Sequence, residues 1–126
     1  MNSTIGEFSW CELITSNVKA AKTFYTKLFG WETEDMPMPE GMIYTIIKAG
    51  GKGIGGIMKT PKEAKGLPPM WVTYVTVDDV DKVVKKAEKL GAKIHVEPTD
   101  IPDVGRFAVL LDPQGAAINV ITYMKM

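Results

Sequence analysis

The 126-residue chain has one cysteine, one histidine and no net charge. The lone Cys11 excludes an intrachain disulfide framework and fits a reducing compartment. Fifteen basic and fifteen acidic side chains leave no cationic excess for nucleic acid or an anionic membrane. No apolar run approaches the roughly 20 residues of a membrane span, and the N-terminus shows no signal core. We therefore expect one soluble, cytoplasmic domain without a nucleic-acid or membrane partner.

The single histidine, His95, restricts the possible chemistry. Sites that need two or three imidazoles from one chain, including the two-His-one-carboxylate iron site, cannot be built. Ser-His-Asp or Cys-His catalysis would have to use His95, and neither Cys11 nor a serine lies in a recognisable nucleophile motif. His95 falls in a predicted strand over residues 93–97, where we interpret it as solvated or structurally bonded.

Two helical patterns divide the chain into similar halves. Each begins after a short polar residue that can cap free N–H groups, Asn17 or Asp79, and each stops at a glycine, Gly30 or Gly91. The residues expected to form the apolar faces are Val18, Ala21, Phe24, Tyr25 and Leu28 in the first helix and Val80, Val83, Val84, Ala87 and Leu90 in the second.

Strand-like runs surround both helices, and the two halves superimpose at an offset of about 61 to 63 residues. The predicted strands cover residues 8–15, 44–49 and 53–58, then 71–77, 107–111 and 116–123. We interpret the chain as one domain, 1–126, made of two strand–helix–strand–strand–strand repeats, about 1–63 and 64–126, joined by a linker at 66–69. Chance similarity of two α+β stretches is the alternative.

A small sheet with one helix leaves its other face uncovered, so each half needs the other. We expect an α+β fold in which the two βαβββ repeats form a curved eight-stranded mixed sheet. The helices would lie outside, and the concave inner face would form a cup suited to a small molecule.

Three segments carry specific motifs. Residues 18–31 contain Phe24-Tyr25 and end in Gly30-Trp31, residues 77–92 contain the second helix, and residues 105–116 spell G-R-F-A-V-L-L-D-P-Q-G-A. Together they resemble the vicinal oxygen chelate superfamily, which includes glyoxalase I, bleomycin-resistance proteins and extradiol dioxygenases. The resemblance covers nearly the whole chain, and it implies the cup-shaped fold and a homodimer whose cups form within one chain or across two.

The resemblance also implies where metal-using members place their four ligands, namely at Trp10, Gly56, Val72 and Asn119. Tryptophan, glycine and valine offer no side-chain ligand atom, and asparagine offers one neutral amide oxygen. Zinc, nickel and iron need imidazole, thiolate or carboxylate donors. We therefore expect no metal and no cofactor.

Strand alternation places Trp10 and Glu12 on one face of their strand and Cys11 and Leu13 on the other. A carboxylate in an apolar cavity would have a raised pKa and could act as acid, base or hydrogen-bond anchor, so Glu12 is the candidate catalytic residue. The alternative is a glutamate at the rim, solvated or paired with a lysine.

Aromatic side chains near Glu12 would suit a flat or apolar ligand, with Glu12 and Asn119 orienting it. The candidate ligand-binding residues are Trp10, Tyr44, Gly56, Met58, Val72, Tyr74, Arg106 and Asn119, and simple core packing is the alternative for each. Arg106 either clamps a ligand carboxylate or phosphate, or pairs with Glu12, Asp112 or another acid.

Two further segments are interpreted as connections. Residues 51–56 spell the dinucleotide fingerprint G-x-G-x-x-G, but Pro61 follows where a helix should begin, so we predict a glycine-rich hairpin instead. Residues 35–41 are expected to form a loop whose course shapes the pocket.

The sequence therefore predicts a glyoxalase-related, metal-independent protein that binds a small molecule in an aromatic-lined cup. The alternatives are a glyoxalase-type lyase or isomerase acting on a small carbonyl compound, an antibiotic-sequestering resistance-type protein, and a protein that uses the fold as an interaction scaffold. The balanced charge gives no sign of the acidic groove that would hold a cationic drug.

Overall fold

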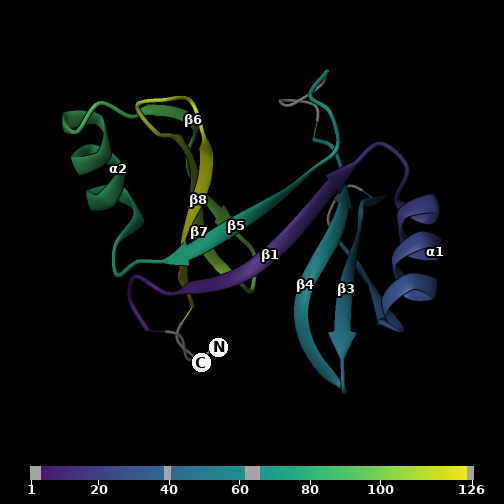
Figure 1. The fold of residues 1–126 in the computed structure, drawn as a ribbon. Helices are drawn as coiled ribbons and strands as arrows, with labels where there is room; N and C mark the ends of the chain where they lie inside the picture. Colours follow the sequence, from purple (N-terminus) through teal and green to yellow (C-terminus); the bar gives the residue numbers. More distant parts are fainter. Residues whose placement is uncertain (1–3, 39–40, 62–65, 125–126) are drawn as a thin grey trace. The chain divides into compact units, whose positions relative to one another are not determined.

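A computed structural model describes residues 4–38, 41–61 and 66–124 of the chain. These residues form eight strands and two helices, which confirms the α+β class (Figure 1). In chain order the elements are β1 (Phe8–Thr15), α1 (Val18–Phe29), β2 (Glu32–Pro37), β3 (Ile43–Ala49), β4 (Lys52–Lys59), β5 (Met70–Thr76), α2 (Val80–Lys89), β6 (Lys93–Ile101), β7 (Gly105–Leu111) and β8 (Ala117–Tyr123).

The strands belong to one mixed sheet with the order β2-β3-β4-β1-β5-β8-β7-β6. Within it the chain divides into two compact units, one spanning Trp10–Val72 and the other containing residues up to Ser9 and from Thr73 onward. We call them the α1 unit and the α2 unit. In the α1 unit β1 pairs in parallel with β4, and β2, β3 and β4 pair antiparallel.

The α2 unit repeats this pattern. Its strand β5 pairs in parallel with β8, and β6, β7 and β8 pair antiparallel. The predicted βαβββ repeats are therefore confirmed at the level of strand order. No helix of the described part of the chain is both long and apolar enough to cross a membrane.

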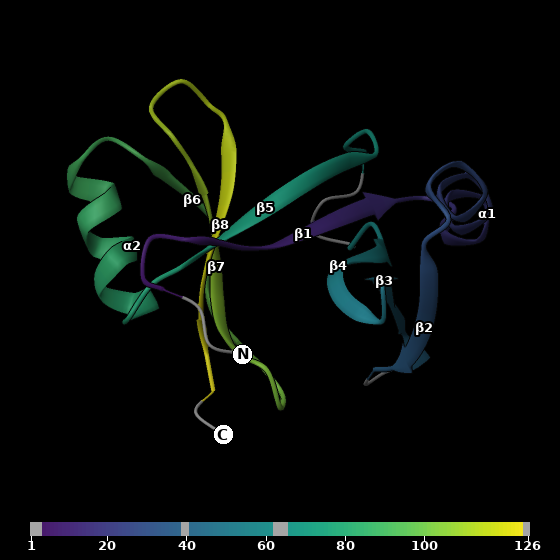
Figure 2. The same ribbon diagram turned by 60° about the horizontal axis from the view of Figure 1, so that its bottom comes forward.

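Helix α1 packs against the sheet of its own unit (Figures 1 and 2). The Asn17 side chain accepts a hydrogen bond from the Ala20 N–H, and Gly30 ends the helix in the left-handed conformation, as the sequence predicts. The buried core contains Leu13, Ile47 and Ile57, with Val18, Ala21, Tyr25 and Trp31 packed against it.

The expected apolar face of α1 is only partly correct. Phe24 is 58% exposed and Leu28 is 57% exposed. The inward stripe follows Val18, Ala21 and Tyr25, which lie three and four residues apart, and Phe24 is turned about 100° away from Tyr25 around the helix axis.

Helix α2 covers its own sheet in the same way. Asp79 caps it by accepting a hydrogen bond from the Lys82 N–H, while Leu90 at its C-terminal end is exposed rather than part of the core. The buried residues of this core are Val80, Val84, Ala108, Leu110 and Val120.

Two predicted connections have different outcomes. Residues 50–51 form the turn of the β3–β4 hairpin and strand β4 follows directly, so the glycine-rich hairpin is confirmed. The predicted loop at 35–41 is wrong in its first part, because Asp35, Met36 and Pro37 belong to β2 and pair with β3. Antiparallel pairing opposite Ile43, Tyr44 and Thr45 keeps this segment extended. Residues 39 and 40 of that loop lie outside the described residues.

Candidate functional site

The candidate site lies on the face of the α1 unit's sheet that is turned away from helix α1. Leu13 joins the core beneath the helix, so its strand neighbour Glu12 points to the opposite face. There the Tyr44 hydroxyl donates a 2.8 Å hydrogen bond to Oε1 of Glu12, and the Trp10 indole Nε1–H donates a 2.8 Å hydrogen bond to the Tyr44 oxygen. The predicted alternation along β1 is confirmed.

Strand register brings these three side chains together. Glu12 lies opposite Gly56 in the parallel β1–β4 pair, and Gly56 lies opposite Ile46 in the antiparallel β3–β4 pair. Tyr44 precedes Ile46 by two residues and therefore projects from the same face. Its hydroxyl lies over Gly56, where a Cβ atom would overlap it. Met58, two residues after Gly56, shares this face and is half-buried.

Glu12 is 5% exposed, which excludes the alternative of a solvated rim glutamate. A buried carboxylate is costly unless hydrogen bonds and charges compensate it. The Tyr44 hydroxyl supplies such a bond, and the indole of Trp10 fixes the tyrosine in turn. The site can therefore present a fixed carboxyl group, able to accept hydrogen bonds, beside two aromatic rings.

The residues at the four implied ligand positions do not fit a transition metal. The Trp10 indole nitrogen is a donor only, the side-chain space of Gly56 is filled by Tyr44, and Val72 is apolar. Asn119 adds one neutral amide. Among residues 4–38, 41–61 and 66–124, no three His, Cys, Asp or Glu side chains gather closely enough to hold a metal ion.

The α2 unit contains two of the predicted residues side by side. Tyr74 of β5 pairs in register with Asn119 of β8, and both are buried. Because Val120 packs beneath α2, the neighbouring Asn119 points to the sheet face turned away from that helix. The Tyr123 hydroxyl near the end of β8 hydrogen-bonds Ser9 Oγ at 2.9 Å, and burial raises the pKa of Tyr123 despite this bond.

Arg106 is held by two acids. Its Nε and Nη2 atoms donate to Asp81 at 2.9 and 3.1 Å, and Nη1 donates to Asp100 at 2.8 Å. These hydrogen bonds raise the pKa of Arg106, and the bonds from Arg106 lower the pKa of Asp81. The predicted pairing of Arg106 with an acid is confirmed, but the acids are Asp81 and Asp100. Asp112 instead accepts backbone N–H bonds in the β7–β8 turn. His95 is exposed on β6.

Sequence reasoning missed an aromatic groove of about 480 Å³ on the helix side of the α1 unit. Trp71 Nε1 donates to the Tyr25 hydroxyl at 3.2 Å there, and the Tyr25 ring stacks on Trp31. The motif Phe24-Tyr25 followed by Gly30-Trp31 is the signal that could have located it. The residues lining the groove are Cys11, Tyr25, Phe29, Trp31, Ile47, Ile54, Gly55 and Trp71.

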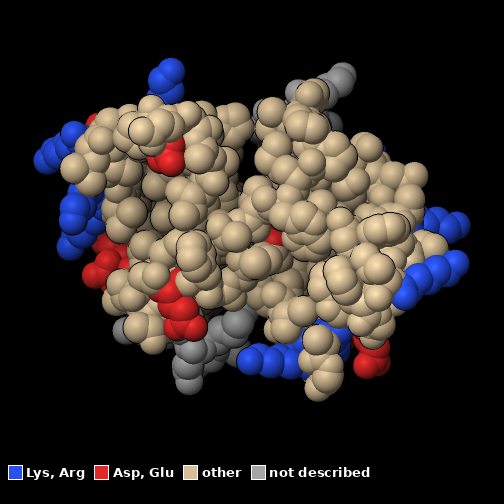
Figure 3. Space-filling view, viewed as in Figure 1, with Lys and Arg blue, Asp and Glu red and all other residues tan. Residues whose placement is uncertain are grey.

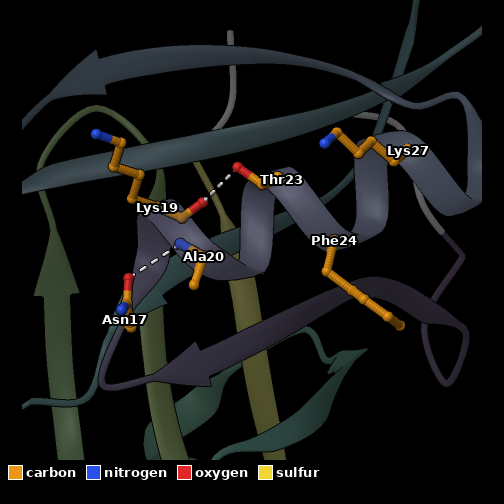
Figure 4. Close-up of a pocket in the computed structure, with 6 residues that line it drawn as sticks. All are labelled: Asn17, Lys19, Ala20, Thr23, Phe24 and Lys27. Carbon is orange, nitrogen blue, oxygen red and sulfur yellow. Dashed lines mark hydrogen bonds between the residues drawn. The ribbon is translucent and has the colours of Figure 1, made fainter.

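A second hollow, of about 580 Å³, runs along α1 and is lined by residues of that helix and its cap alone. Figure 4 shows Lys19 and Lys27 pointing to one side of the helix and Phe24 to another, so the side chains do not converge on a common point. In Figure 3 many of the basic side chains in view lie over the two helices. Neither view shows a convergent charged site.

Comparison with known proteins bears on the family to which the chain belongs. Residues 7–120 match the model of the Glyoxalase/Bleomycin resistance protein/Dioxygenase superfamily. The chain belongs to this superfamily. The Mycobacterium tuberculosis (strain CDC 1551 / Oshkosh) protein named "Putative glyoxylase CFP32" is 41% identical over 117 residues, covering 91% of this chain and 45% of the relative. "Anthracycline biosynthesis protein DnrV" of Streptomyces peucetius is 32% identical, covering 91% and 46%.

The chain thus spans about half the length of the curated relatives it matches. Among solved structures, methylmalonyl-CoA epimerase from Mycobacterium tuberculosis superimposes with a TM-score of 0.68 at 14% identity, over 99% of this chain and 94% of that one. A hypothetical protein, BH1468 from Bacillus halodurans C-125, reaches 0.69 at 10% identity, over 96% of each chain. At these identities the likeness concerns the fold of the superfamily.

Proposed function

We propose that this chain is a small-molecule-binding member of the superfamily that holds its ligand against Trp10, Glu12 and Tyr44 without a transition metal. The observation that supports the proposal is the buried Glu12 carboxylate, which Tyr44 and Trp10 hold in a chain of two 2.8 Å hydrogen bonds. Such an arrangement is pre-organised, so binding need not order these side chains.

The chemistry of the three side chains indicates the class of ligand. The carboxyl of Glu12 accepts hydrogen bonds and, when ionised, carries a negative charge, so it matches an amine or a hydroxyl group. The rings of Trp10 and Tyr44 match a flat, mostly apolar body, and they also favour a nearby ammonium group. We therefore propose a ring-containing ligand with an amine or hydroxyl substituent.

An anthracycline, a flat ring system with an amino sugar, has this chemistry, and a relative carries the name anthracycline biosynthesis protein. We therefore expect daunorubicin to bind in a calorimetric titration, with EDTA present throughout. Glu12→Gln should weaken binding about tenfold, because a charge-assisted hydrogen bond becomes a neutral one. Glu34→Gln, on exposed strand β2, is the matched control and should change the affinity less than twofold.

The proposal fails if daunorubicin and a panel of amine-bearing aromatic compounds give no binding heat with the wild type and do not shift its unfolding midpoint. It also fails if binding is present but equal in wild type and Glu12→Gln, because the ligand would then lie elsewhere.

The buried carboxylate also favours a second candidate, a lyase or isomerase acting on a small carbonyl compound. Glu12 could remove a proton from carbon next to the carbonyl, and a buried base of this kind is common in proton-transfer enzymes. We would measure turnover of the glutathione–methylglyoxal hemithioacetal and epimerisation of methylmalonyl-CoA, each with and without EDTA. Turnover that EDTA leaves intact and Glu12→Gln abolishes would establish this candidate in place of simple binding.

We also propose that the chain forms a homodimer. Phe24, Leu28 and Phe29 expose large apolar side chains on α1, and patches of this kind mark contact surfaces. Sedimentation at micromolar concentration should give twice the chain mass, and Phe29→Lys should reduce it to the monomer. A monomeric wild type would refute this.

The single-domain organisation and the cytoplasmic location remain predictions from the sequence.

A further inference from the structure

Gly56 and Tyr44 fit each other as a pair. A Cβ atom built on Gly56 would overlap the hydroxyl and ring of Tyr44, although its backbone conformation suits any residue. Gly53, on the same strand, is different. Its Cβ would make only ordinary contacts, 3.5 Å from Ile46 Cγ2 and 3.9 Å from Trp10 Cη2. With Tyr44 in this position, residue 56 has no room for a side chain.

We infer that Tyr44 is the positioning residue of this site and the residue that decides its chemistry. Its hydroxyl occupies the space in which a side chain at residue 56 would stand, and from there it holds the Glu12 carboxylate and the Trp10 indole. Position 56 is one of the four ligand positions that the superfamily resemblance implies. A hydrogen-bond chain through Tyr44 thus occupies the space that a metal-binding side chain at residue 56 would need.

Two consequences follow from this geometry. The Glu12 carboxyl accepts a hydrogen bond from the Tyr44 hydroxyl, so this hydroxyl, and not the ring alone, contributes to its orientation. A ligand side chain introduced at residue 56 has no room while Tyr44 is present. The inference rests on the proposed function in placing a ligand at this face, but its first two tests need no organic ligand.

The first test is a double-mutant cycle between residues 44 and 56, read by thermal unfolding. Gly56→Ala should lower the unfolding midpoint by about 5 to 10 °C, since overpacking in a buried site forces side chains to move. In the Tyr44→Val background the same substitution should lower it by less than about 2 °C. Gly53→Ala is the matched control, and its effect on the unfolding midpoint should be small in both backgrounds. A Gly56→Ala effect that does not depend on Tyr44 would overturn the steric pairing.

The second test asks whether Tyr44 keeps a metal out. Trp10→His with Gly56→His places two imidazoles beside Glu12, a donor set typical of zinc. With Tyr44→Ala added, we expect zinc to bind at least tenfold more tightly than in the same double variant with Tyr44 retained, measured by competition with a chromophoric chelator. Equal affinities, including no binding in either protein, would overturn the metal-excluding role.

The third test separates positioning from structure. Tyr44→Phe retains the ring but removes the hydroxyl. The NMR signal of the Trp10 indole N–H, assigned with Trp10→Phe, should move upfield and lose its protection from exchange with water, and daunorubicin affinity should fall about tenfold. A purely structural tyrosine would instead lower the unfolding midpoint with the affinity unchanged, which would overturn the inference. If daunorubicin does not bind the wild type, the proposed function fails, and the indole signal and the unfolding cycle still decide the role of Tyr44.

Discussion

Asp35 connects two strands and the helix of the α1 unit. Its carboxylate accepts a 2.7 Å hydrogen bond from the Thr45 hydroxyl on β3 and 3.1 Å hydrogen bonds from the Lys22 ammonium on α1. Thr45 is 0% exposed, whereas the side chain of Asp35 is 47% exposed. Asp35→Ala therefore leaves a buried hydroxyl without its acceptor and an exposed ammonium without its ion pair.

The two losses differ in size. A buried hydroxyl without a partner costs about 1–3 kcal/mol, and an exposed ion pair contributes roughly 0.2–1 kcal/mol. We expect Asp35→Ala to lower the free energy of unfolding by about 2 kcal/mol at pH 7. Once Thr45→Val has removed the hydroxyl, Asp35→Ala should cost about 1 kcal/mol or less, because only the pair with Lys22 remains to be lost.

The effect should also depend on pH. The hydrogen bonds from Thr45 and then Lys22 hold the pKa of Asp35 below its ordinary value in the folded protein. A carboxyl group with a lowered folded pKa stabilises the fold above its unfolded pKa and loses that contribution as the pH falls through the folded pKa. The difference between wild type and Asp35→Ala should therefore be complete near pH 6 and shrink below about pH 4.

Urea unfolding followed by circular dichroism at pH 7, 4 and 3 would measure these values. Glu34→Ala is the matched control, because Glu34 is the strand neighbour of Asp35 and its exposed side chain pairs with Lys48 instead. It should change the free energy of unfolding by less than about 0.5 kcal/mol. The reasoning would be refuted if Glu34→Ala and Asp35→Ala lowered the free energy of unfolding equally. It would also be refuted if Asp35→Ala cost as much in the Thr45→Val background as in the wild type.

Three further outcomes are expected. Gly30→Ala should cost about 1 kcal/mol in chemical unfolding, because Gly30 ends α1 at a φ of 72°, and an effect near zero would contradict the left-handed cap. Ile57→Ala should cost about 2–5 kcal/mol, since the side chain is fully buried, and a smaller cost would place it outside the core. The exposed Cys11 thiol should react with a disulfide reagent without denaturant, and the adduct should quench tryptophan fluorescence because Trp31 and Trp71 line the same groove.

Local features were predictable because short stretches of sequence determine them. The caps at Asn17 and Asp79 need only a short oxygen-bearing side chain next to free N–H groups, and both form hydrogen bonds as expected. The alternation that separates Glu12 from Leu13 follows from the two-residue period of a strand. The repeat was visible because each half has the same order of such local elements.

Features that depend on distant partners were not predictable. Asp35 lies in a polar segment with proline and methionine, which is typical of a loop, yet pairing with β3 extends it as a strand. Pairing of Arg106 with an acid was expected, but Asp81 and Asp100 could not be named as its partners, because Asp81 lies on α2 and Asp100 on β6, and only the packing of helix on sheet brings both to it. Phe24 was assigned to the core because the sequence alone does not show how wide the buried apolar face of a helix is.

Tyr44 and Gly56 show how the two kinds of information combine. Tyr44 was predicted to line the site from its position in a strand, and Gly56 from the superfamily resemblance, which implies a missing metal ligand there. The β1–β4 and β3–β4 registers add the missing step, because they bring the tyrosine hydroxyl over the glycine and against Glu12. On the inference made above, the glycine leaves room for the tyrosine hydroxyl, and a hydrogen-bond chain occupies the space that a metal ligand at residue 56 would need.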